Sequence, residues 1–405
     1  MARRRETLGE RVKELRRERG LDQRGLADTL KRSVSWVSQV ERGEIEVGDV
    51  GMIQRLALAL SVPSRDLIEL VLGDDAAELE TQRPSVEQLR LALAGHPVPL
   101  AASRSASPPK RSTDDLLAGV ADGWTLLHAS DFEHLGPLLA RLILDLESAS
   151  RRTSDEELLR VLASLADTYQ MAAAMLVKVG DIGAGWIAAD RAIAVGDRCG
   201  DPCLVMAGQL RMGHTFVDSN ENDLALHVLR QAVAVAKILT TESDPGLISL
   251  TGSCALLLAV LEARRGNAEE ARRHLKVATG LARRLGSDRN DYGTEFGPTN
   301  VKLHQVAIEV ELGNAAEALR LSKGVDSGGL SRERRSRFLV DIARAHAQKR
   351  DARSAVAALT EAEYIASAEV SDSRLVRELL ADLEHLARGQ TIPGLRPLKR
   401  RATHK

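Results

Sequence analysis

Aromatic residues are scarce in this chain of 405 residues, at 2% of the sequence, although the residues AVILMFWYC together reach 44%. The apolar content is therefore mostly alanine, leucine and valine. Alanine and leucine favour helices, whereas strands favour β-branched and aromatic side chains. The composition predicts an all-α protein and argues strongly against an all-β sandwich.

The chain has only three cysteines, Cys199, Cys203 and Cys254, which are too few for a disulfide framework. Cys199 and Cys203 lie near His214, but this spacing has no second pair of metal ligands. We expect the cysteines to be small buried side chains, and we expect no metal site.

Targeting and catalytic motifs are also missing from the sequence. The opening MARRRETLGER has no apolar core of a secretory signal, and the longest apolar run, Cys254 to Leu261, is too short for a membrane span. No glycine-rich phosphate loop, GxSxG elbow or HExxH motif occurs. We expect a soluble, reduced, cytoplasmic protein that is not an enzyme and has no cofactor.

Charge is nearly balanced over the whole chain but not within it. The formal net charge is -1, yet residues 1–42 hold ten Arg and two Lys against seven acidic residues, which gives +5. A local basic segment of this kind fits contact with nucleic acid. The rest of the chain carries a net charge of -6, which does not. The run Arg3-Arg4-Arg5 is either an arm that contacts DNA or a solvated disordered end.

Proline marks the boundaries between the expected domains. Residues 74–113 contain five of the twelve prolines and the run AASRSASPPKRST, which is typical of an exposed, partly extended linker. Ser85 could cap one short helix within it, with Val86, Leu89 and Leu93 on one face. We expect a helical domain over 1–73, this linker, a long helical domain over 114–388 and a disordered basic tail over 389–405.

Two short helices with a tight turn between them form the strongest motif. Asp22 can cap the first helix and Ser33 the second, and only about three residues separate the two. Such a pair is a helix-turn-helix, whose second helix can enter the DNA major groove. Flanking helices at Leu8–Arg19, Val50–Leu60 and Pro63–Leu72 would complete the core. The expected core residues are Leu8, Val12, Leu15, Leu26, Ala27, Leu30, Val37, Val40, Ile53, Leu56, Leu60, Leu67 and Ile68.

These residues resemble the phage repressor and Cro-type helix-turn-helix family, also called the Xre family. The matching positions are Gln23, Leu26, Ala27, Ser33, Val37, Ser38, Glu41, Gly43 and Leu56 to Leu60. The sequence departs from the family at Lys31, where a turn glycine is usual. A left-handed lysine costs about 1 kcal/mol or more relative to glycine, so the turn has another shape or the first helix runs one residue longer.

The resemblance implies roles for residues at matching positions. The base contacts would be Val34, Ser35 and Gln39, with Ser38 as a second choice, because glutamine suits adenine and valine can touch a thymine methyl. The backbone contacts would be Gln23, Arg42, the Gly43 amide and Trp36, although Trp36 could equally pack on the domain surface. Glu41 would pair with Arg16 as a structural ion pair.

Similar phrases recur in the long C-terminal region. Gly266-Asn267-Ala268, Gly313-Asn314-Ala315, Arg350-Asp351-Ala352 and, more weakly, Gly180-Asp181 each precede a helix with alanines three apart. This pattern is typical of stacked helix pairs, and it resembles the tetratricopeptide repeat family. Aliphatic residues replace most of that family's aromatic positions, and the spacing is irregular. We expect six helix pairs and a final helix near Asp372 to Leu386; the alternative is a non-repetitive helical bundle.

A solenoid would present a ligand groove lined by the first helix of each pair. Asn300 and His304 are four residues apart and share a helix face, where an asparagine could bind a peptide backbone. Gln209 and His214, or Tyr169 and Gln170, are weaker candidates. The alternative for Asn300 and His304 is an ordinary, hydrogen-bonded helix surface.

The two regions together predict a DNA-binding transcriptional regulator. The combination resembles regulators that join an Xre-type head to a tetratricopeptide body and respond to peptides, which implies a peptide ligand. One head buries little surface, so we expect a homodimer on a pseudo-palindromic operator in double-stranded DNA. The alternative function is a scaffold whose solenoid binds a partner protein while the head localises it to DNA.

Overall fold

The computed structural model describes residues 7–30, 32–45, 47, 52, 56, 57, 59, 60, 62, 67, 76–95, 111–238, 244–371, 373–387 and 391–403. The chain divides into two compact units, Met1–Thr81 and Gln82–Thr403. Apart from one isolated bridge between Arg289 and Phe296, the regular structure in these residues is helical. The prediction of an all-α protein is confirmed.

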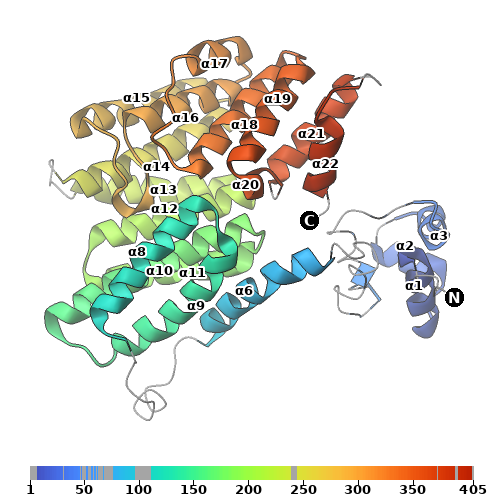
Figure 1. The fold of residues 1–405 in the computed structure, drawn as a ribbon, viewed down its shortest axis with the longest axis horizontal. Helices are drawn as coiled ribbons and strands as arrows, with labels where there is room; N and C mark the ends of the chain where they lie inside the picture. Colours follow the sequence, from blue (N-terminus) through green and yellow to red (C-terminus); the bar gives the residue numbers. More distant parts are fainter. Residues whose placement is uncertain are drawn as a thin grey trace. The chain divides into compact units, whose positions relative to one another are not determined.

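The first unit begins with three short helices, α1 (Leu8–Glu18), α2 (Gln23–Leu30) and α3 (Val34–Glu41) (Figure 1). Each helix has a polar face and contributes the buried residues expected from the sequence, because apolar residues recur at helical spacing. The shared core contains Leu8, Val12, Leu15, Leu26, Ala27, Leu30, Val37, Val40, Leu56, Leu60 and Leu67. The predictions for Lys31, Ile53 and Ile68 lie outside the described residues.

The second unit, which we call the helical body, contains six consecutive helix pairs, as predicted (Figure 1). The pairs are α8 (Thr113–Ala129) with α9 (Phe132–Ala149), α10 (Asp155–Lys178) with α11 (Ile182–Cys199), α12 (Pro202–Asp218) with α13 (Asn222–Ile238), α14 (Pro245–Arg264) with α15 (Ala268–Leu285), α16 (Pro298–Glu311) with α17 (Ala315–Ser322), and α18 (Arg332–Gln348) with α19 (Ala352–Ile365). A short 3₁₀ turn, η2 (Asp291–Gly293), precedes α16. The helices α20 (Ser367–Ser371), α21 (Arg374–Ala387) and α22 (Leu395–Thr403) follow the sixth pair.

Every pair is joined by the same left-handed turn. Two residues before each second helix, one residue has a positive φ; these residues are Ser130, Gly180, Asn220, Gly266, Gly313 and Arg350. The next amide donates to the carbonyl five residues earlier, as from Asp181 to Leu176 and from Asn267 to Glu262. These bonds satisfy carbonyls that the first helix leaves unpaired, so one backbone motif ends the first helix and starts the second.

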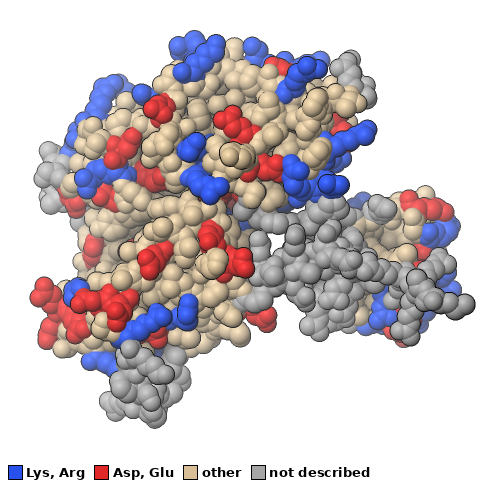
Figure 2. Space-filling view, viewed as in Figure 1, with Lys and Arg blue, Asp and Glu red and all other residues tan. Residues whose placement is uncertain are grey.

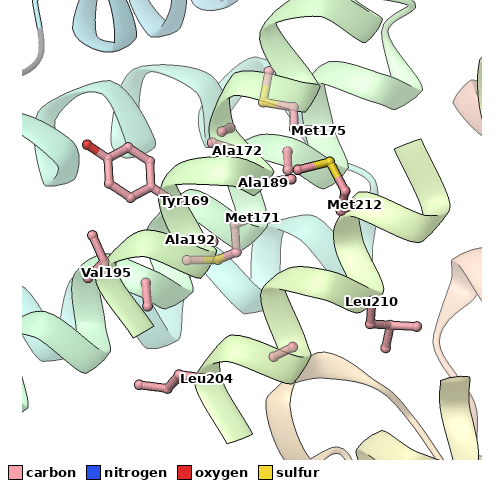
Figure 3. Packing of buried hydrophobic residues seen from close by; sticks show 14 of the residues in the cluster. Tyr169, Met171, Ala172, Met175, Ala189, Ala192, Val195, Leu204, Leu210 and Met212 are labelled. Atoms are coloured by element: carbon pink, nitrogen blue, oxygen red, sulfur yellow. The ribbon is translucent and has the colours of Figure 1, made fainter. Parts of the chain in front are cut away.

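Small residues allow the helices to pack closely. A Cβ atom on Gly196 would lie 2.9 Å from the Val205 amide nitrogen, and one on Gly208 would lie 2.9 Å from the Ile193 nitrogen. The crossing of α11 and α12 therefore requires glycine on both helices. Around it, Ala189 and Ala192 of α11 lie among larger side chains such as Met171 (Figure 3).

One described helix, α14, is long and apolar enough to cross a membrane by length and composition, but 83% of its apolar window is buried inside the protein. Leu250, Cys254 and Leu261 of this helix are fully buried in the core. The helix is apolar on all sides because neighbouring helices surround it.

The structure differs from the predicted linker. The helix α6 (Ala76–Ala94) runs across the boundary between the two units, and Ser85 lies inside it instead of capping it. Leu89 and Leu93 are buried in the core of the helical body, and Arg191 donates to the Leu93 carbonyl over 2.7 Å. Leu89 and Leu93 share a buried helix face, as predicted, and residues 96–110 of the predicted linker lie outside the described residues.

The predicted disordered tail is also wrong for residues 395–403. The basic segment forms α22, in which Leu395, Leu398 and Ala402 are buried against the last helices of the body. Arg401 pairs with Glu363 at 2.5 Å. The apolar residues share one helix face, which the many basic residues around them conceal in the sequence.

Replacing Arg350 by glycine tests the left-handed turns. Arg350 has a φ of +60°, a conformation that glycine adopts without strain. Glycine also gives the unfolded chain more entropy, which opposes folding, so Arg350→Gly should stabilise the body by roughly 0.5–1 kcal/mol in balance. The denaturant midpoint of the full chain measures this. Gly313→Ala is the opposite case. Gly313 has a φ of +78° and no atom lies within 4 Å of the added Cβ, so the alanine strains the backbone without a clash and should lower the midpoint. Equal midpoints for both variants would contradict the role of the turn.

Candidate functional site

The helices α2 and α3 are capped as the sequence predicts. The Asp22 carboxylate accepts from the Gly25 amide at 2.7 Å, and the Ser33 hydroxyl accepts from the Trp36 amide at 3.1 Å. Between the helices, the Arg32 amide donates to the Ala27 carbonyl at 2.9 Å. These bonds end α2 and start α3 within a few residues, which gives the short turn of a helix-turn-helix.

The helix α3 has one buried face and one accessible face. Val37, Val40 and Glu41 are buried against the core. On the other side, Val34 is 43% exposed, Ser35 is exposed, and Ser38 and Gln39 are half-buried. The structure therefore brings all four predicted base-contact residues to one face of α3, with their side chains available to a ligand in solvent.

Two of the predicted backbone contacts are already occupied within the protein. Arg42 donates twice to the Glu44 carboxylate, at 2.8 and 3.0 Å, and once to the Ser38 hydroxyl at 3.1 Å. The Gly43 amide donates to the Val40 carbonyl at 3.0 Å and closes α3. Arg42 is exposed and could exchange Glu44 for a phosphate, but the Gly43 amide is not free for one.

The other two backbone-contact candidates are half-buried. The Gln23 amide nitrogen donates to Glu41 at 2.8 Å, so its side chain stabilises the domain in addition to any contact outside it. The Arg32 guanidinium lies 5.5 Å from the centre of the Trp36 ring. Trp36 therefore packs on the domain surface, and Arg32 beside it is a basic group that the sequence analysis did not select.

The predicted ion pair of Arg16 with Glu41 is present and buried. Arg16 Nε lies 2.5 Å from Glu41 Oε1, and Nη2 lies 3.0 Å from Oε2. Arg16 also donates to the Leu21 carbonyl at 2.7 Å, so this one side chain connects α1 with the start of α2 and the end of α3. A Cβ on Gly9 would lie 2.3 Å from the Val40 carbonyl, which shows how closely α1 and α3 approach.

The ionisation of Glu41 depends on these partners. Burial by itself raises the pKa of Glu41, but the hydrogen bonds from Arg16 and Gln23 outweigh burial, and the net pKa lies below its ordinary value. Because the pKa of Glu41 is lower in the folded state than in the unfolded state, the ionised Glu41 stabilises the domain fully at a pH above the ordinary glutamate pKa. This stabilisation is lost as the pH falls through the lowered pKa of the folded state.

The predicted groove residues do not form one site. His214 lines a cavity in the helical body, but Gln209, Asn300 and His304 do not. His304 Nδ1 donates to the Asn300 carbonyl oxygen, 3.0 Å away, and burial lowers the pKa of His304 to about 3. Helix residues share a face when they are three or four positions apart. Gln209 and His214 are five positions apart, so they lie on different faces of α12.

Three of the candidate groove residues have a buried side-chain amide oxygen without a hydrogen bond. Among the described residues, these oxygens are Gln170 Oε1, Gln209 Oε1 and Asn300 Oδ1. Tyr169, by contrast, is fully buried and donates to Glu147 at 3.1 Å. Tyr169 is therefore a core residue and does not line a groove.

The cavity beside His214 contains groups that the sequence analysis missed. Trp124 and His128 of α8 stack with ring centres 5.8 Å apart, and Arg211 lies 5.5 Å from the centre of the Trp124 ring. Arg337 of α18 lines the same cavity. These residues are far apart in the sequence, and only the spacing of Arg211, His214 and Asp218 along one helix face could have suggested them. On the face shown in Figure 2, basic and acidic side chains are interspersed over the body, so surface charge does not mark this site.

Among the described residues, no group of three His, Cys, Asp or Glu side chains could hold a metal ion. The three cysteines are free thiols. Burial raises the pKa of Cys203 to about 11 and that of Cys254 to about 12, so both thiols are protonated.

The buried Arg16–Glu41 pair, the close caps and the accessible α3 face are all features of a DNA-reading domain. Residues 7–71 match the family model of the helix-turn-helix domain. The helix-turn-helix domain predicted from the sequence is thereby confirmed. A search of curated proteins found no match to the chain. Among solved structures, the crystal structure of Bacillus thuringiensis PlcR in complex with the peptide PapR7 and DNA is similar, with 15% identity over 69% of this chain and 96% of that chain and a TM-score of 0.27.

Removing Glu41 should unfold the helix-turn-helix domain locally. Glu41→Ala leaves Arg16 buried without its carboxylate, which costs roughly 3–5 kcal/mol. Hydrogen exchange of the α1 to α3 amides in the full chain measures the loss. Glu44→Ala is the matched control, because Glu44 is 53% exposed and its ion pair with Arg42 is screened by solvent and contributes little to stability. Equal protection in the two variants would contradict a structural role for Glu41.

Proposed function

We propose that this protein is a sequence-specific, DNA-binding transcriptional regulator that works in the cytoplasm. The observation that carries the proposal is α3 itself: its buried face holds it in a matched helix-turn-helix domain, and its other face presents Val34, Ser35, Ser38 and Gln39. A helix presented in this way can enter the major groove and read base edges there.

The residues divide into reading and positioning roles. Gln39 would read adenine through its amide oxygen and amide nitrogen, and Val34 would touch a thymine methyl. Arg32 and Arg42 would contact phosphates, for which Arg42 must leave Glu44. Glu41 and Arg16 take no part in reading; they hold α3 at its angle to α1.

We infer that the head over residues 1–73 acts as a homodimer and that the helical body supplies the second activity, which is dimerisation, ligand sensing or both. A single head of this size buries too little surface for tight specific binding, whereas two heads on a pseudo-palindrome double the contacts. The polar cavity beside His214 supports a sensing role for the body. The proposal gives the protein no catalytic role.

Selection of DNA sites from a random pool by the full chain tests this function. The expected result is a pseudo-palindromic site whose half-site centres lie about one helical turn, or a multiple, apart. The mass of the bound complex by light scattering should correspond to two chains. Recovery of no enriched sequence would overturn the proposal, and enrichment of a single half-site bound by one chain would overturn the dimer.

A second test replaces Gln39, which faces outward on α3. Gln39→Ala should weaken binding to the selected site by about 1–3 kcal/mol and relax one base position, because the truncated side chain no longer reads that base. Fluorescence anisotropy with variant sites measures both effects. Gln88→Ala is the matched control, since Gln88 is an exposed glutamine in α6. Unchanged affinity and base preference in Gln39→Ala would contradict the assigned reading face.

A further inference from the structure

The cavity in the helical body lies where distant pairs of the solenoid meet. One side comes from the first helices of the first three pairs, α8, α10 and α12, and the other from α18 of the sixth pair and the segment around η2. Lys178 of α10 joins the two sides, with ion pairs to Glu333 at 2.9 Å and to Glu369 at 2.6 Å. The cavity is therefore lined by elements more than two hundred residues apart in the sequence, α8 and α18.

The polar wall of the cavity is rich in guanidinium groups. Burial and the positive charges of Arg211, Arg337 and Arg334 depress the pKa of His214 well below its ordinary value, so its ring is uncharged. Arg211 donates to the Gly293 carbonyl at 3.0 Å, and Arg334 donates to the Thr294 carbonyl at 3.1 Å. The backbone oxygen that holds Arg211 does not neutralise its charge, whereas Arg334 also forms an ion pair with Glu295, whose carboxylate lies 3.5 Å from Arg334 Nε.

Arg337 is the group that lacks a partner. Within the part of the chain that the structure describes, its side chain lines the cavity with no hydrogen bond and no ion pair. Burial lowers the pKa of Arg337, but the charges of Asp218, Asp341, Glu333 and Glu369 outweigh burial and raise it overall. The nearby carboxylates of Glu333 and Glu369 are paired with Lys178. Asp218 also faces the cavity but lies too far from Arg337 for an ion pair, and burial raises the pKa of Asp218.

Part of the wall is apolar. Trp124 and Leu127 of α8 and Ala174 and Val177 of α10 line the cavity together with its charged groups, and Trp124 lies against Arg211. A site with an apolar patch beside one unpaired guanidinium fits a ligand that has an apolar part and an anionic group, because buried apolar surface supplies affinity and the charge pair fixes orientation.

We propose that this cavity binds a small amphiphilic anion, whose carboxylate or phosphate group is held by Arg337 and His214 and whose apolar part packs on Trp124 and Val177. This inference deepens the proposed sensing role. Only an effect of the anion on DNA binding rests on that proposed function, because binding of the anion to the cavity can be measured by itself. The occupant contacts α8, α10, α12 and α18 together, so it biases the contact between the first and sixth pairs.

Four probes with the same apolar part test the headgroup: hexanoate, hexyl phosphate, hexanol and hexylamine. Calorimetry with the full chain should show that one or both of the anions bind at least about tenfold more tightly than hexanol, since a charged hydrogen bond is worth that much, and that hexylamine binds no better than hexanol. The better of the two anions identifies the natural headgroup as carboxylate or phosphate. Equal binding of all four probes, tighter binding of hexylamine, or binding of none would overturn the proposal.

Variants of both walls locate the site. Arg337→Gln should weaken the better anion at least about tenfold and leave hexanol unchanged, and Asp218→Asn should strengthen the anion because it removes a like charge. Arg335→Gln is the matched control, on the same helix but outside the cavity. Ala174→Phe fills the apolar wall and should abolish binding without touching the arginines. Unchanged anion affinity in both Arg337→Gln and Ala174→Phe would overturn the proposal.

DNA binding by the same preparations separates this inference from the proposed function. Anion binding without any DNA selection would support the cavity and refute the regulator. DNA selection without anion binding would refute the cavity alone. Circular dichroism melts confirm that each variant is folded before its affinity is compared.

Discussion

The helical body depends on one backbone constraint that recurs at each pair: a residue in the left-handed region two positions before the second helix. The turn satisfies the last carbonyls of one helix while it reverses the chain, so each pair forms a hairpin of helices. Only three of these positions are glycine. Ser130, Asn220 and Arg350 adopt the same conformation at an energetic cost, which the packing of the surrounding helices offsets.

A different constraint controls the head. The helices α1, α2 and α3 are short and share an apolar core, and the Arg16–Glu41 pair adds direction to that contact. Gln23 contributes to the same cluster, although its position suggested a role at DNA. The outward face of α3 is thus set by a hydrogen-bonded network on its inward face, and reading and folding depend on adjacent residues.

The sequence predicted the class of fold, the caps of α2 and α3, the ion pair and the number of helix pairs, because each depends on local spacing or on a motif. It predicted the ends of the body poorly. Leu398 lies in a segment rich in arginine, and its burial depends on partners elsewhere in the chain. The same limit applies to the cavity: Arg211 and Arg337 meet only after six pairs have stacked, and no local pattern reports that meeting.

The bridge from Lys178 to Glu333 and Glu369 has a consequence for how this body could change in length. In an open solenoid each pair touches only its neighbours, so pairs can be gained or lost one at a time. Here the second pair also meets the sixth, and an inserted or deleted pair would move Lys178 out of register with both carboxylates. The bridge therefore ties the second pair to the sixth, and a change in the number of pairs between them would break it.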